Sequence, residues 1–146
     1  MALARGEFAT AAAGFEAILK DEPGYLDAPQ LLARAREGQQ ASARDAFEAG
    51  NRLDVAGDWV AALQKYDLAR QIDPSLAGLD DAARRARERM RAAGVDAFKR
   101  ARQYDALGRS TEAIKEYEKA AQWLPSEDLN RRAARDRADQ LKAGPK

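Results

Sequence analysis

The sequence contains no cysteine and no histidine, and these two absences exclude several kinds of chemistry. Without cysteine the chain can form no disulfide and has no thiolate nucleophile. Without histidine it lacks the commonest general base and the commonest metal ligand of proteins. The carboxylates are many, but nothing in the sequence marks a catalytic pair. We therefore expect a protein that is not an enzyme, with no catalytic residues, no metal and no cofactor.

Other features are scarce rather than missing. Aromatic residues make up 7% of the chain, and no apolar run approaches the roughly 20 residues that span a bilayer. Residues 1–14 have no continuous apolar core, so we expect neither a signal peptide nor a membrane span. Alanine, arginine, leucine and glutamate dominate, which favours helix throughout. The excess of arginine suggests a GC-rich, bacterial source, and the composition fits cytoplasm or periplasm alike.

The charge is balanced overall and uneven along the chain. The net charge is +1, yet residues 1–80 carry 8 Lys/Arg against 13 Asp/Glu, and residues 81–146 carry 17 against 11. The arginines between Arg84 and Arg91 stand one or two positions apart, so they spread around a helix instead of lining one face. Acidic residues are interleaved, and pairs such as Arg84 with Glu88 suit a solvated helix. We therefore do not expect a nucleic-acid partner.

Four residue types recur every 51 residues. They are Gly6, Gly57 and Gly108; Ala11, Ala62 and Ala113; Phe15, Tyr66 and Tyr117; Pro23, Pro74 and Pro125. Self-similarity with a period of tens of residues is typical of stacked helical repeats.

The glycine and the proline within each period predict three short helices. Glycine permits the turn that precedes each helix, and proline prevents the helix from continuing. Asp58 and Ser110 are suitable N-caps for two of them. The predicted helices are Phe8 to Leu19, Trp59 to Ile72 and Thr111 to Trp123.

The two 33-residue segments that join these helices, 24–56 and 75–107, each predict one long helix. Their apolar residues follow one another in steps of three and four without a change of phase. Pro29 fits the first helical turn. The alternative is two helices per segment, with a kink near Ser42 and another near Gly94. After Pro125, residues 126–141 predict a further, more polar helix that would cap the array.

The pattern resembles the tetratricopeptide repeat. The second copy has Gly50, Leu53, Gly57, Ala62, Tyr66, Ala69 and Pro74 in the family's register, and the third has Ala101, Tyr104, Gly108, Ala113, Tyr117, Ala120 and Pro125. The resemblance implies an all-α helical-repeat solenoid of antiparallel helix pairs. Because the period is 51 and not about 34, helix A of each pair would be lengthened. We expect a single domain over residues 1–146, with a partial first repeat (1–23), two full repeats (24–74 and 75–125) and a C-terminal capping helix with its tail (126–146).

The resemblance also implies a function. Such repeats bind a peptide or a partner helix on their concave face, which is lined by helix A residues. By register these are Arg44, Phe47, Asn51 and Asp54 in the second repeat, and Phe98, Lys99, Arg102 and Asp105 in the third. The asparagine's counterpart in peptide-binding relatives holds the backbone of an extended peptide. Phe47 and Phe98, 51 residues apart, are either anchors for such a ligand or packing residues between helices.

A structural role is the alternative function. Most of helix A of the first repeat would precede residue 1, so the chain is either a fragment of a larger repeat protein or has an apolar face to cover. A homo-oligomer formed through this exposed first repeat, or a self-assembling scaffold, would cover it. Trp59 and Trp123 stand at positions that favour packing over binding.

Overall fold

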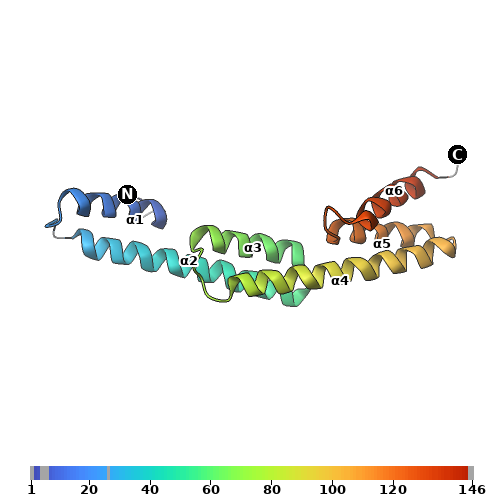
Figure 1. Ribbon diagram of the computed structural model, residues 1–146, viewed down its shortest axis with the longest axis horizontal. Coiled ribbons are helices and arrows are strands. Elements are labelled where there is room, and N and C mark those ends of the chain that lie inside the picture. The colour runs from blue at the N-terminus through green and yellow to red at the C-terminus, as the bar shows by residue number, and fades with distance from the viewer. Residues whose placement is uncertain (1, 4–6, 26, 145–146) are drawn as a thin grey trace. The chain divides into compact units, whose positions relative to one another are not determined.

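The fold is all-α. The computed structural model describes residues 2–3, 7–25 and 27–144, and within these residues there are six helices and no strand. The helices are α1 (Phe8–Asp21), α2 (Ala28–Ala56), α3 (Trp59–Ile72), α4 (Leu79–Ala106), α5 (Ser110–Trp123) and α6 (Leu129–Ala143) (Figure 1). None of these helices is long and apolar enough to cross a lipid bilayer.

The prediction of one continuous helix in each long segment is confirmed. α2 has 29 residues and α4 has 28, and neither is interrupted at Ser42 or Gly94. Pro29 lies in the first turn of α2, where its missing N–H has no helical partner to lose. An unbroken sequence of apolar steps was therefore a reliable sign of an unbroken helix.

The ends of the short helices follow mostly from their flanking residues. Gly57 and Gly108 adopt positive φ angles of 81° and 71° at the turns that lead into α3 and α5, whereas Gly6 lies outside the described residues. The Asp58 side chain accepts a hydrogen bond from the backbone N–H of Ala61, as expected of an N-cap.

The prediction that Ser110 caps α5 is wrong. Ser110 is the first residue of the helix, and the N-cap position belongs to Arg109, whose side chain makes no capping bond. The Arg109 guanidinium instead pairs with Glu112 and lies 5.1 Å from the centre of the Tyr104 ring.

The chain divides into two compact units, residues 1–83 and residues 84–146. In the first unit, α1 packs on the N-terminal half of α2 through Ala11, Ala12 and Ala35. α3 packs along the C-terminal half of α2, where the buried Tyr66 ring covers Gly50. The two halves of α2 therefore pack against two different short helices.

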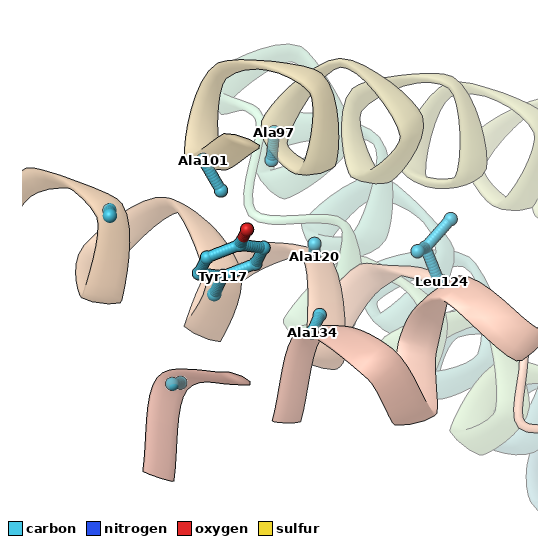
Figure 2. Packing of buried hydrophobic residues seen from close by; sticks show 8 residues of the cluster. Ala97, Ala101, Tyr117, Ala120, Leu124 and Ala134 are labelled. Carbon is cyan, nitrogen blue, oxygen red and sulfur yellow. The ribbon is translucent and has the colours of Figure 1, made fainter. Parts of the chain in front are cut away.

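In the second unit, α5 packs between α4 and α6. Figure 2 shows the Tyr117 ring beside Ala97 and Ala101 of α4, with Ala120 of α5 and Ala134 of α6 close by. Most buried residues of the chain are alanines, so the helices can approach closely, and the few large buried side chains fill the remaining space.

Candidate functional site

The first four candidate residues lie on α2, in the first unit, at steps of three and four along one helix face. Their depths differ. Arg44 is exposed, while Phe47, Asn51 and Asp54 are half-buried. The face therefore presents a charged end to solvent and a mixed apolar and polar end close to α3.

Phe47 packs against α3 without being fully buried. Its ring centre is 5.8 Å from that of Tyr66, with the two planes at 47°. Pairs at this distance and tilt are favourable aromatic contacts. The ring therefore both supports the helix pair and keeps part of its surface accessible.

Asn51 is oriented by the same tyrosine. The Tyr66 hydroxyl donates a hydrogen bond of 2.9 Å to Oδ1 of Asn51. An amide side chain has two N–H donors beside its carbonyl oxygen. With the oxygen held by Tyr66, the NH₂ group is the part of Asn51 that can donate to a ligand backbone.

Three of the other four candidates line a shallow hollow on α4, in the second unit. Phe98, Lys99 and Arg102 border it with Gln103 and Ala106, and its volume is about 420 Å³. The Phe98 ring centre is 5.8 Å from that of Tyr117, at an interplanar angle of 65°. An aromatic side chain beside two cationic side chains can accept an apolar group together with a carboxylate.

Asp105 differs from the other three candidates on α4, because its carboxylate already contacts other side chains of the protein. Arg137 of α6 donates to both oxygens, at 2.7 and 2.8 Å, and the Tyr117 hydroxyl lies 3.3 Å from Oδ2. The hydrogen bonds from Arg137 hold the pKa of Asp105 below its usual value. Asp105 therefore ties α4 to α6, and its oxygens are already coordinated by neighbours.

Sequence reasoning missed a second carboxylate of this kind. Glu116 of α5 is buried, and it accepts hydrogen bonds from Arg100 at 2.8 Å and from Lys119 at 2.5 Å. Burial alone would raise the pKa of Glu116, but the bonds from Lys119 and Arg100 outweigh it and lower the pKa. The position 51 residues earlier is Lys65, so the repeat pattern contained no hint of a buried acid here.

The eight candidates form two separate surfaces, one on each unit. Within the part of the chain that the structure describes, no three residues among Asp and Glu gather in a way that could hold a metal ion. What the two surfaces share is an aromatic ring packed on a tyrosine and flanked by polar or cationic side chains. No protein-family model matches the chain, and no curated protein or solved structure matches it either.

Proposed function

We propose that the chain is a tetratricopeptide-like helical-repeat protein that binds a segment of another protein and catalyses no reaction. In this proposal α2 with α3 and α4 with α5 are equivalent antiparallel pairs of a solenoid, and α6 caps it. The support is the recurrence of one contact: Phe47 on Tyr66 and Phe98 on Tyr117 both have ring centres 5.8 Å apart, and the pairs are 51 residues apart in sequence.

The observation that carries the binding role is the hollow at Phe98, Lys99 and Arg102. Lys99 and Arg102 are exposed, whereas Phe98 is half-buried. A partner with an apolar side chain on Phe98 and a carboxylate on Arg102 would match this arrangement. Asn51 adds a separate point of contact on the first unit, because its NH₂ group can donate to a backbone carbonyl.

The test is to place a photo-crosslinking amino acid at Gln103, which borders the hollow, and to identify the proteins captured from a cell lysate by mass spectrometry. Arg102→Glu reverses an exposed charge and should abolish capture without changing the melting temperature. Lys115→Glu, which makes the same change of sign on the exposed surface of α5, is the matched control and should capture as the native chain does.

Phe98→Ala separates binding from packing. We expect loss of capture with a moderate loss of stability, since only part of the ring is buried against Tyr117. Retained capture with Arg102→Glu would contradict the proposal. If Phe98→Ala unfolds the second unit, the ring serves mainly as a packing residue and the binding role rests on Arg102 alone.

A further inference from the structure

A second hollow of the second unit is lined by apolar and cationic side chains together with two glutamates. It has a volume of about 540 Å³ and lies where the end of α5 meets α4. Met90, Trp123 and Pro125 supply the apolar surface, and Arg84, Arg87 and Arg91 stand around it. None of these residues belongs to the surface around Phe98, so this hollow goes beyond the function proposed above.

The three arginines share one helix face. Arg84, Arg87 and Arg91 are spaced by three and four residues, which places them on the same side of α4. Two glutamates of the lining, Glu88 and Glu127, offset part of this charge, and Glu88 lies 3.6 Å from Arg84. The surrounding unit remains strongly basic, because residues 84–146 carry 17 Lys/Arg and 10 Asp/Glu, a net charge of +7.

The chain also contains a segment with the complementary chemistry. At the end of α1 and in the connection to α2, the sequence has Asp21, Glu22 and Asp27 with no basic residue between them. Tyr25 stands among them with 51% of its surface exposed. The unit around this loop is acidic, since residues 1–83 carry 8 Lys/Arg and 14 Asp/Glu, a net charge of −6.

Two backbone hydrogen bonds involve Tyr25. The backbone N–H of Tyr25 donates to the carbonyl of Glu22 at 3.1 Å, and the N–H of Ala28 donates to the carbonyl of Tyr25 at 3.2 Å. Tyrosine, tryptophan and arginine are the residue types that contribute most to binding energy at protein interfaces.

We propose that the acidic segment of one copy, with Asp21, Glu22, Tyr25 and Asp27, docks in the arginine-lined hollow of a second copy. Tyr25 lies on Met90 and Trp123, and the loop carboxylates pair with Arg84, Arg87 and Arg91. Donor and acceptor surfaces are different, so the contact is heterologous, and in a pair one copy keeps a free hollow while the other keeps a free loop. Such an interface joins copies head to tail, into rings where the rotation between copies closes and into open chains where it does not, and in both cases the mean mass rises with concentration.

A contact between one loop and one hollow is small, so it belongs to the weak, transient class of interfaces. The mass should therefore be followed by sedimentation and light scattering from about 10 μM to about 1 mM, which spans the range of weak affinities. We expect the mass to rise above the 16.0 kDa of one chain as concentration increases. It should fall back when salt is raised from about 20 mM to about 500 mM, because exposed charges are then screened.

Charge reversal identifies the two surfaces. Arg87→Glu with Arg91→Glu reverses the hollow, and Glu22→Lys with Asp27→Lys reverses the loop. Each double variant alone should remain at 16.0 kDa. An equimolar mixture of the two should associate again, because the native loop of the first meets the native hollow of the second.

Two more variants separate this site from general attraction between the oppositely charged units. Arg85→Glu with Arg89→Glu makes the same charge change on α4 at residues that do not line the hollow, and it should leave association unchanged. Tyr25→Ala removes the apolar anchor without a change of charge and should weaken association at least about tenfold. Two results would overturn the proposal: a native chain that stays at 16.0 kDa throughout, or equal losses from the hollow variant and its α4 control.

Discussion

Tyr66 and Tyr117 occupy the same position of the repeat, yet their hydroxyl groups bind different partners. Tyr66 donates to Asn51, and Tyr117 lies within bonding distance of Asp105. The residue 51 positions after Asn51 is Arg102, which has no acceptor atom. The Tyr117 hydroxyl therefore uses a carboxylate one turn later on α4, and that carboxylate is held in place by α6.

Gly50 is a residue where a single added methyl group should lower stability. A Cβ atom at this position would lie 2.5 Å from Cε1 of Tyr66, whose side chain is fully buried. We expect Gly50→Ala to lower the free energy of unfolding by about 1–3 kcal/mol, because a buried ring has to move to make room. Chemical denaturation followed by circular dichroism measures this loss.

Gly14→Ala is the matched control for this substitution. Gly14 lies inside α1, and beyond its two chain neighbours and the nearby backbone of its own helix no atom is within 4 Å of the position that a Cβ would take. Replacing a glycine in an exposed helix interior by alanine should raise stability by about 0.5–1 kcal/mol. If both substitutions changed stability in the same direction, the close approach of Tyr66 to Gly50 would not explain the result.

At the scale of single residues, the sequence predicted which helix face a residue occupies, but not how deeply its side chain is buried. Phe47 and Phe98 could have been either anchors or packing residues, and both are half-buried against tyrosines. Asp105 was placed on the correct helix, but its partner Arg137 is 32 residues away on α6. Spacing within one helix contains no information on how a neighbouring helix is rotated, so this pairing could not be foreseen.

At the scale of the elements, glycine, proline and the apolar steps predicted nearly all of the helices. The largest difference is at α6, which begins at Leu129 and not at Ser126. Residues 125–128 form a turn, in which the N–H of Asp128 donates to the carbonyl of Pro125 at 3.1 Å. The Asp128 side chain then caps α6 by accepting a bond of 2.9 Å from the N–H of Asn130. The start of the helix is set by this cap and not by the preceding proline alone.

The ion pairs that connect α4, α5 and α6 should make the second unit sensitive to acid. The pKa values of Asp105 and Glu116 are both lowered, so these carboxylates stabilise the fold fully above about pH 5. The contribution is lost as the pH falls through about 4 and below, because the folded state then has to bind protons that the unfolded state takes up more readily. Urea unfolding of the native chain should therefore show a clear loss of stability between pH 7 and pH 3.5.

The variant Asp105→Asn with Glu116→Gln tests which groups cause this loss. It should be less stable than the native chain at pH 7, because the ion pair of Asp105 with Arg137 and those of Glu116 with Arg100 and Lys119 are weakened. Its stability should also change less between pH 7 and pH 3.5, since the two responsible carboxylates are gone. An equally large change in the variant would assign the acid sensitivity to other carboxylates.

At the scale of the whole molecule, the two compact units should open separately in hydrogen exchange. Each unit has its own buried residues, and repeat proteins are stabilised mainly by contacts between neighbouring elements. Gly50→Ala should speed exchange at the amides of α2 and α3 by about 5- to 150-fold, as its loss of stability implies. The amides of α5 and α6 should exchange at unchanged rates. A uniform increase over all six helices would show that the chain unfolds as one cooperative unit.

The repeat period was visible in the sequence, but the division into units was not. The prolines mark the end of each copy, at Pro74 for the second, whereas the compact units divide after Ala83, inside α4. Periodicity reports where a pattern starts again, and α4 begins in one unit and continues into the other. The pattern of residue types therefore predicts where each repeat ends, but it does not predict where one compact unit ends and the next begins.

The alanine-rich packing has a consequence for how the helices align. A helix surface of alanines looks nearly the same at every turn, so two such helices could slide past each other by a turn and bury almost the same area. Tyr66 removes this ambiguity, because a glycine at position 50 is what leaves room for its ring on α2. One aromatic side chain and one missing methyl group thus select a single alignment of α3 on α2 among several that alanines alone would leave nearly equal in energy.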